Sequence, residues 1–422
     1  MALALVTGIA VSAGNGASAA VLPALPPSTQ FDITGFLQVV TLDQACVTAA
    51  GANLDAQGHP QVAHCGGTMM LNGHTIIVPN ETIAILPASA LTWQELFAQA
   101  PAPYGPTQTG MALADLPKPL TTYEVQAVGN RVLDPGNVDP TKRDRYIAGL
   151  VHISQQDLNA GAGYINFMDY TTGEMRVGGV LGDPTTGARV QINDPANPTS
   201  ASGGRYGRAL TPDPRFMVDQ DNPTIASATG YPMCFPRTDP AVADDPLCPV
   251  GNRPLDVTGV FSMAFQMQDP ANIPLGGALD PRVQAPMEIG DFINFAGTLI
   301  ADAAGTYMSA HTITDNAAIR TFPGTDPAYV SIEVGLMGTG GLTVFGAGEA
   351  AVRTKFEGMT TDPSRRIHLY GIDVNPDGTT SDRDWGTIFP DDAAGAVPGR
   401  WRFRPPCLTF GSVPASVITT PP

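Results

Sequence analysis

Charged side chains are scarce in this sequence, and the shortage limits what the chain can bind. Only 14% of its 422 residues are charged, and acids outnumber bases by 39 to 22, which gives a net charge of −17. Proteins that bind nucleic acids or anionic membranes need clustered lysine and arginine, because their targets are negatively charged. The sequence therefore argues against both partners. The excess of carboxylates suits solubility and divalent cations instead.

Long apolar runs are missing as well. Beyond the N-terminus, no run reaches the roughly 18 apolar residues that a membrane-spanning helix needs. The first residues are small and apolar, and Ala17-Ser18-Ala19 resembles a signal-peptidase site, although no basic segment precedes it. We therefore expect residues 1–19 to be a signal peptide whose start lies upstream, with an ordered apolar arm as the alternative. The first interpretation predicts a secreted or cell-surface protein.

Cysteine is rare, and its spacing excludes common metal motifs. The five cysteines show neither the CxxC nor the CxxCH spacing of zinc ribbons and c-type haem sites. In an exported protein, cysteines usually form disulfides. We predict two local bridges, Cys46–Cys65 and Cys234–Cys248, and we expect Cys407 to be either buried or paired outside the chain.

Turn-forming residues and alternating patterns dominate the remaining sequence. In residues 290–313, polar and apolar residues alternate on either side of a break at 302–305, and residues 67–83 repeat the pattern around Asn72-Gly73. Asn-Gly suits a two-residue type I′ turn, because both residues tolerate a positive φ. With 46 glycines and 40 prolines, the chain favours short strands and turns over long helices.

The expected fold is mainly β, with several small OB-like barrel or sandwich modules joined by long loops rich in proline and glycine. The expected parts are a first β-module at 20–120 with one helical turn at 88–98, an OB-like module at 121–194, a long irregular loop with a disulfide at 195–254, an OB-like module at 255–345, and a terminal β segment with a calcium loop at 346–422.

Three stretches carry a resemblance. The sequences GTMMLNGHTIIVPNETI (67–83) and GDFINFAGTLIADAAGTYMSAHTI (290–313) resemble the small OB-type barrel repeats of uncharacterised secreted proteins from bacteria and fungi. The segment GYINFMDYTTGEMRVGG (163–179), followed by GARVQIND (187–194), is similar to parts of the same group. The resemblance implies an OB-like fold and export, and it implies no catalytic residues.

The strongest local motif is DVNPDGTTSDRD at residues 373–384, whose spacing resembles the twelve-residue calcium loop. Calcium takes about six to eight oxygen ligands, which alternate residues of a tight loop supply, and Gly378 falls where such a loop must turn. Aspartate replaces the usual glutamate at the last position, so we predict an isolated calcium loop on a β scaffold. An ordinary acidic surface turn is the alternative. The predicted ligands are Asp373, Asn375, Asp377, Thr379, Ser381 and Asp384.

These features together predict an exported structural, cell-surface or matrix protein that calcium stabilises and that self-assembles as a homo-oligomer or filament. We expect growth through the apolar N-terminal segment up to about Leu42, an arm that adds a strand to the next subunit and that deletion of residues 20–30 would disable. Two alternatives stay open. One is a secreted hydrolase of a polysaccharide or polyester with its site in residues 195–254, although the sequence contains neither G-x-S-x-G nor S-x-x-K. The other is a calcium-dependent carbohydrate-binding protein, which Trp385 beside the calcium loop would favour.

Overall fold

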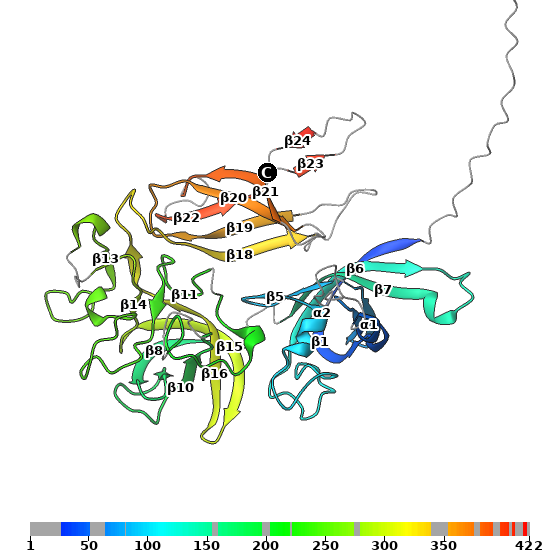
Figure 1. Cartoon of the computed structure of the whole chain (residues 1–422), viewed down its shortest axis with the longest axis horizontal. Coiled ribbons are helices and arrows are strands. Elements are labelled where there is room, and N and C mark those ends of the chain that lie inside the picture. Colours follow the sequence, from blue (N-terminus) through cyan, green and yellow to red (C-terminus); the bar gives the residue numbers. More distant parts are fainter. Residues whose placement is uncertain are drawn as a thin grey trace, which may run out of the picture.

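The chain folds mainly into strands that form several small sheets, as the sequence predicted (Figure 1). The two α-helices within the described residues, α1 (Gln44–Ala50) and α2 (Trp93–Ala98), are short. The computed structural model describes residues 27–50, 64–80, 82–153, 159–195, 203–219, 222–273, 279–338, 353–374, 380–390, 397–404, 407–409 and 417–419.

Five strands of the N-terminal part close into a barrel. They are β1 (Ser28–Leu42), β2 (Gly67–Leu71), β3 (His74–Val78), β6 (Glu124–Leu133) and β7 (Asp144–Ile153). Antiparallel pairing links β3, β2, β1, β6 and β7 in that order, and parallel pairing of β3 with β7 completes the ring. This is the strand order of an OB-type Greek-key barrel. Its interior is filled by apolar side chains such as Leu37, Ile76 and Val151.

The first barrel crosses the boundary that we expected at residue 121. Strands β6 and β7 follow that position in the sequence, yet they complete the ring that β1, β2 and β3 begin. Alternation predicted each of these strands, but it does not show which strand lies beside which, because pairing depends on contacts between distant residues. The short strands β4 (Ile83–Ile85) and β5 (Ala90–Thr92) and helix α2 lie between β3 and β6 in the sequence.

Helix α2 begins at a capping box. The Oγ1 of Thr92 accepts a hydrogen bond from the Glu95 amide at 3.2 Å, and the Glu95 carboxylate accepts one from the Thr92 amide at 2.7 Å. This capping box satisfies two amides that would otherwise lack partners. The sequence analysis placed the helix at 88–98, and residues 90–92 instead form β5. It did not predict α1.

A second barrel repeats the plan of the first. Its strands are β8 (Ala160–Asp169), β9 (Glu174–Val177), β10 (Ala188–Ile192), β15 (Phe292–Asp302) and β16 (Gly305–Asp315). Antiparallel pairs link β10, β9, β8, β15 and β16, and parallel pairing of β10 with β16 closes the ring. A short strand pairs in parallel with the last strand of each barrel, β4 with β7 and β11 (Ile225–Ser227) with β16. The chain therefore contains two barrels of one topology.

The two barrels also share a bulge that carries an amide side chain. Gln38 in β1 has no opposite residue in the pairing of β1 with β2, and Asn166 in β8 has none in the pairing of β8 with β9. The Oε1 of Gln38 accepts a hydrogen bond from the Gly73 amide at 2.8 Å, and the Oδ1 of Asn166 accepts one from the Gly179 amide at 2.9 Å. In both barrels, the bulge therefore fixes the connection between the second and third strands.

A smaller C-terminal module follows, drawn in yellow and orange in Figure 1. Strands β18 (Val330–Gly338), β19 (Arg353–Thr360) and β22 (Arg400–Phe403) form an antiparallel sheet, and β20 (Ile367–Val374) pairs with β21 (Thr380–Ile388). Ile367, Trp401 and Phe403 form its core, against which Trp385 packs. Strands β23 (Cys407–Thr409) and β24 (Val417–Thr419) pair with each other. Cys407 is the first residue of β23.

The remaining short elements lie in the connections. They are β12 (Met233–Cys234), β13 (Ala264–Gln266), β14 (Ala285–Pro286) and β17 (Ala318–Arg320), with the 3-10 turns η1 (Pro140–Lys142), η2 (Pro214–Phe216), η3 (Val250–Asn252) and η4 (Pro270–Asn272). Aspartate side chains cap many of these turns, as Asp139 does when it accepts a bond from the Thr141 amide. Part of the negative charge is therefore used for local structure.

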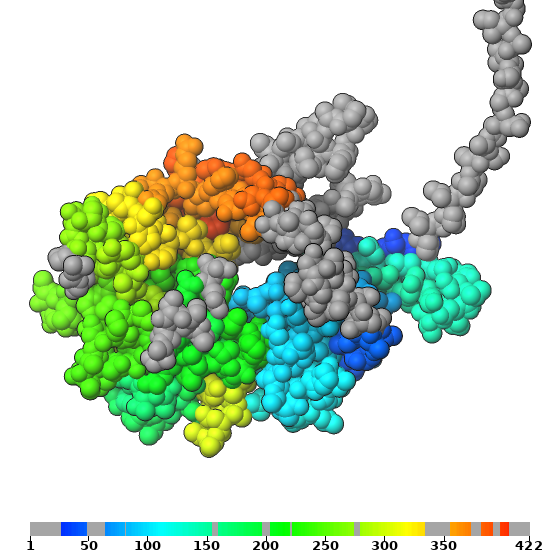
Figure 2. All heavy atoms as spheres, in the orientation of Figure 1, coloured from blue at the N-terminus to red at the C-terminus, as the bar shows by residue number. Residues whose placement is uncertain are grey.

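In the space-filling view, the second barrel lies against the first barrel and against the C-terminal module (Figure 2). The amide of Ile332 in β18 donates to Asn222, at 3.1 Å, and the hydroxyls of Thr321 and Thr361 are 2.9 Å apart. The connection between β10 and β15 and the end of the second barrel therefore hold the C-terminal module in place.

The N-terminal arm is only partly described. Residues 28–30, which belong to the arm expected to reach a neighbouring subunit, pair with β6 of their own barrel. For these residues the arm folds back on its own module. The predicted signal segment, residues 1–19, lies outside the described residues.

Candidate functional site

Four charged side chains gather inside one end of the second barrel. Asp291 directly precedes β15 and Asp315 ends β16, so the pairing of the two strands brings their carboxyl groups together. Arg253 comes from the end of η3, and Glu288 lies in the turn that follows β14. Each of the four residues is 9% exposed or less. We call them the Arg253 cluster.

Arg253 holds the centre of the cluster. Its Nη2 donates to Asp291 Oδ1 at 2.7 Å, its Nη1 donates to the other oxygen of the same carboxylate, and Nη1 also reaches the Pro286 carbonyl at 3.3 Å. The Glu288 amide donates to the Asp291 carboxylate at 2.7 Å. Bidentate pairing of this kind is the strongest way to hold a buried carboxylate.

The other two carboxyl groups lack a comparable partner. Asp315 Oδ1 accepts a bond from the Ala317 amide at 2.8 Å, but no donor reaches Asp315 Oδ2 or Glu288 Oε1, and both atoms are buried. Burial, followed by the charge of Asp291 and a hydrogen bond with it, raises the pKa of Asp315 to about 8, although Arg253 opposes the shift. Burial also raises the pKa of Glu288 to about 7, again against Arg253. The cluster thus retains protons near neutral pH.

The sequence analysis did not find this cluster. Its members are dispersed between residues 253 and 315, and none belongs to a recognised motif. One signal was available, since Asp291 and Asp315 stand at the open end of the hairpin predicted for residues 290–313. Because the four side chains are buried, they can store protons and tie segments together but present no surface to a large substrate.

The predicted calcium loop lies at the end of the hairpin formed by β20 and β21. Asp373 pairs with Ser381, so these two predicted ligands meet where the hairpin turns. Asn375, Asp377 and Thr379 lie outside the described residues. Asp384 is opposite Tyr370, about 10 Å further along the strand at 3.3 Å per residue.

Asp384 already has partners of its own. Its carboxylate is 2.8 Å from His368 Nε2 and accepts the Gly386 amide at 2.7 Å. In the parts of the chain that are described, no three His, Cys, Asp or Glu residues are grouped to hold a metal ion. Calcium at this hairpin stays a prediction that rests on the residues nearest the turn.

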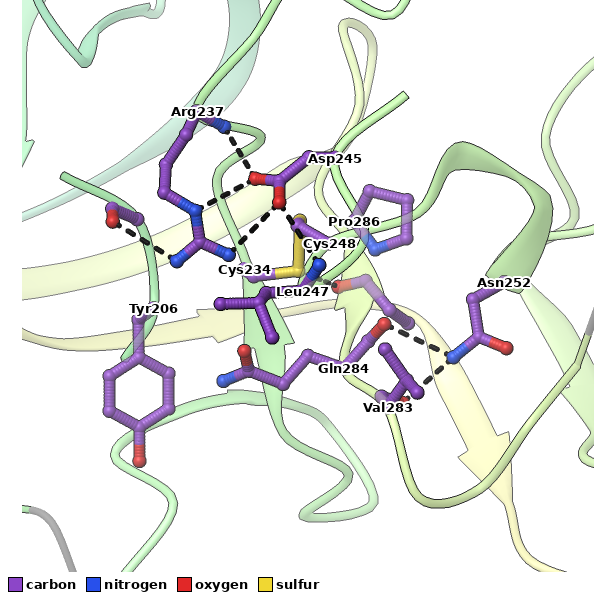
Figure 3. Close-up of a disulfide and its surroundings, with 12 residues drawn as sticks. Tyr206, Cys234, Arg237, Asp245, Leu247, Cys248, Asn252, Val283, Gln284 and Pro286 are labelled. Carbon is purple, nitrogen blue, oxygen red and sulfur yellow. Dashed lines mark hydrogen bonds and ion pairs between the residues drawn. A yellow bond between two sulfur atoms is a disulfide. The ribbon is translucent and has the colours of Figure 1, made fainter. Parts of the chain in front are cut away.

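Both predicted disulfides are present. Cys46 is bonded to Cys65, beyond the end of β1, and Cys234 is bonded to Cys248. Figure 3 shows the second bridge beside the ion pair of Arg237 with Asp245, whose Nε and Oδ2 are 2.8 Å apart. The disulfide and the ion pair therefore fasten the same irregular loop, where little apolar surface is available. Two disulfides are typical of proteins that mature in an oxidising compartment.

Another buried ion pair, Arg215 with Asp213, links the two barrels. Arg215 in η2 donates to both carboxylate oxygens of Asp213, at 3.0 and 2.8 Å, and its Nη1 donates to the Leu96 carbonyl of the first barrel at 2.8 Å. The adjacent Phe216 ring packs against Tyr123, with ring centroids 5.5 Å apart. Phe216 is part of the core of the first barrel, although it belongs to the connection between β10 and β15.

Two arginines described within residues 195–254 form buried ion pairs. Arg215 and Arg237 are buried against the carboxylates of Asp213 and Asp245. These contacts give no support to a hydrolase site in this segment. They show instead that the irregular segment ties the barrels together.

The tryptophans do not form an exposed platform. Trp93 and Trp401 are 1% exposed, and Trp385 stacks on Phe356 with ring centroids 5.5 Å apart and an interplanar angle of 25°. Trp385 is half-buried, because it is the extra residue of a bulge in β21 and its ring packs on the core of the C-terminal module, so it gives no support to an exposed sugar-binding platform. The outer face of β20 presents Tyr370, which is 50% exposed.

Comparison with known proteins finds no matching family, no similar curated protein and no similar solved structure. Within the described residues, no helix is long and apolar enough to cross a membrane.

Proposed function

We propose that this chain is an exported structural protein of the cell surface or extracellular matrix. One observation carries the proposal: buried charged groups in the connections, such as Arg215 and Arg253, bond to neighbouring segments inside the fold. An enzyme normally arranges such groups around an accessible cleft. Here they serve to hold modules and loops, which suits a protein whose task is to keep its shape.

Export is part of the same proposal. Two disulfides support it, because free thiols are the rule in the cytosol. Closed barrels also support a structural role outside the cell, since a ring leaves few unpaired edges for proteolysis or aggregation. The proposed protein is stabilised by calcium and assembles with copies of itself into oligomers or filaments.

The experiment is to purify the protein from the culture medium of cells that express it. N-terminal sequencing should find a start near residue 20, and light scattering with electron micrographs should show self-assembled particles or filaments. Incubation with polysaccharides and polyesters should release no products. Retention in the cytosol with free thiols would contradict export, and a specific hydrolytic activity would contradict the structural role.

A second candidate function is calcium-dependent carbohydrate binding by the outer face of β20 and β21. Tyr370 is exposed there, its ring centroid is 5.8 Å from that of His368, and His368 pairs with Asp384. An aromatic face beside polar groups is suited to a sugar ring. Glycan-array binding that requires calcium and is lost in Tyr370→Ala would favour this function. Binding that is unchanged in Tyr370→Ala would exclude this face.

A further inference from the structure

A rigid loop with exposed aliphatic side chains projects beside the Arg253 cluster. We call it the 254–263 loop. The Ser262 amide donates to the Pro254 carbonyl at 2.8 Å, which joins the two ends of the loop. Leu255, Val257 and Val260 are 57%, 105% and 61% exposed.

The loop keeps its shape through a side chain at its tip. The Oδ1 of Asp256 accepts bonds from the amides of Thr258 and Val260, at 2.7 and 3.1 Å. An aspartate that caps its own turn holds the backbone without help from other segments. The tip is therefore rigid in itself, and its position depends on what holds its base.

Arg253 holds that base. Its Nε donates to the Ser262 carbonyl at 3.4 Å, its Nη2 is 3.1 Å from the Met263 sulfur, and its guanidinium lies 5.9 Å from the centre of the Phe261 ring. The same guanidinium binds Asp291 on the barrel. Arg253 thus helps to set the position of the 254–263 loop, together with the Ala318 amide, which donates to the Met263 carbonyl at 2.7 Å.

The charges around Arg253 balance only if protons are present. Arg253 neutralises one carboxylate, Asp291, whereas Asp315 and Glu288 each have a buried oxygen without a donor. A buried, unpaired carboxylate is strongly unfavourable, so the group takes up a proton instead. A proton on Asp315 Oδ2 also supplies the donor for its hydrogen bond with Asp291.

We propose that a proton on Asp315, directed toward Asp291, locks the base of the 254–263 loop, and that loss of this proton as the pH rises releases the loop. Arg253, Asp291, Glu288 and Asp315 are the charged groups of this site, and they come from the end of η3, the turn after β14, the residue before β15 and the end of β16. When the proton leaves, Asp315 and Asp291 repel each other and compete for Arg253. The loop would then be held most firmly in acidic surroundings and become mobile as the pH rises.

The direction of the pH dependence follows from the direction of the pKa shift of Asp315. The pKa of Asp315 is higher in the folded chain, at about 8, than in the unfolded chain. Its contribution to the lock is therefore complete below the unfolded pKa, about 4, and is lost progressively as the pH rises from there to about 8. Between pH 6 and pH 8, linkage predicts up to about a hundredfold loss of protection, and between pH 8 and pH 9 almost none.

Hydrogen exchange of the full mature chain tests the proposal. Protection of the amides in residues 254–263 is measured at pH 6 and pH 9 and corrected for the intrinsic effect of pH on exchange. Wild type should lose up to about a hundredfold in protection, whereas Asp315→Asn, which retains a donor but does not titrate, should lose less than about threefold. Asp32→Asn in the first barrel removes the same charge elsewhere and should behave as wild type.

Three results would overturn the proposal. Wild type that keeps its protection at pH 9 has no proton-dependent lock, and an equal loss in Asp315→Asn places the titrating group elsewhere. The third applies even if the variant does not fold: infrared spectra of wild type should contain the band of a protonated carboxyl group at pH 6 and lose it by pH 9. Absence of that band at pH 6 would contradict a proton on Asp315.

Discussion

His311 of the second barrel occupies the position that Gly149 holds in the first. Each is the extra residue in the bulge between the last two strands, skipped by the register of its partner strand. Gly149 is exposed, whereas His311 is 5% exposed, and its Nδ1 lies 3.0 Å from Thr312 Oγ1. A bulge directs one side chain out of the normal alternation. In the second barrel that freedom places an imidazole inside the fold.

The first prediction concerns acid sensitivity. Burial lowers the pKa of His311 to about 4, so the folded chain binds this proton less readily than the unfolded chain does. The stability that this neutral histidine contributes is complete above about pH 6.5 and is lost as the pH falls toward 4. His311→Gln should reduce the acid-side loss by up to about 3 kcal/mol. Urea unfolding at pH 7 and 4.5 measures it, and the same pH dependence in both proteins would contradict the prediction.

The second prediction compares the two bulge amides. Asn166 Nδ2 contacts the carbonyls of Val180, Asp183 and Thr186 in addition to the Gly179 bond, whereas Gln38 makes the single described contact with Gly73. Asn166→Ala should cost about 3 kcal/mol and Gln38→Ala about 1 kcal/mol, because a net hydrogen bond contributes about 1 kcal/mol and buried carbonyls would lose their donor. Urea unfolding at pH 7 gives both values. Equal costs would show that the extra contacts add nothing.

The third prediction concerns the contact between the barrels. Arg215→Ala leaves the buried Asp213 without its partner and should destabilise the chain by about 3–5 kcal/mol. Since Arg215 also binds Leu96 of the first barrel, calorimetry should resolve two transitions in place of one. Arg215→Lys, which keeps the charge but not the bidentate bond, is the control. Its stability should lie between the stabilities of wild type and Arg215→Ala. A single unchanged transition in Arg215→Ala would show that the barrels are coupled elsewhere.

The fourth prediction concerns the loop in Figure 3. Removing the bridge in Cys234→Ala/Cys248→Ala opens a loop with a sequence separation of 14, which by chain entropy should cost about 3 kcal/mol. Thermal unfolding without reductant measures the loss. The Arg237–Asp245 pair remains and should keep the loop folded at room temperature. Stability equal to that of wild type would mean that the ion pair alone is sufficient.

The fifth prediction concerns calcium. Asp373 meets Ser381 at the turn of the hairpin, and Asp384 is bonded to His368 further along it. In calorimetry, Asp373→Ala and Asp377→Ala should abolish the heat of calcium binding, whereas Asp384→Ala should retain most of it. Equal heats in wild type and Asp377→Ala would exclude a calcium site in this loop.

Individual strands could be predicted from the sequence, but their partners could not. Alternation identified the segments that became β1, β15 and β16, and Asn72-Gly73 does form the turn between β2 and β3, where both residues have positive φ. These are local properties. The parallel contacts that close each ring join strands far apart in the chain, and no local pattern encodes them.

The candidate site could not be predicted for the same reason, since its residues come together only through contacts between distant parts of the chain. The disulfide pairs were predictable, because each bridge joins neighbouring parts of the chain. Arg253 and Asp315 are far apart in the sequence, and only the fold of the second barrel brings them together. Residues 255–261 open the OB-like module that was expected at 255–345, but they do not form one of its strands. Asp256 instead captures the backbone amides of its own turn.

The insertion between β10 and β15 has a consequence for how the protein is made. Ala160 in β8 pairs with Ala296 in β15, so the second ring cannot close until the polypeptide beyond residue 296 has been synthesised. Contacts between distant segments also form slowly, because a long loop must be ordered first. The second ring of the nascent chain therefore stays open until late in synthesis, whereas the first ring has all its strands once Ile153 has been added.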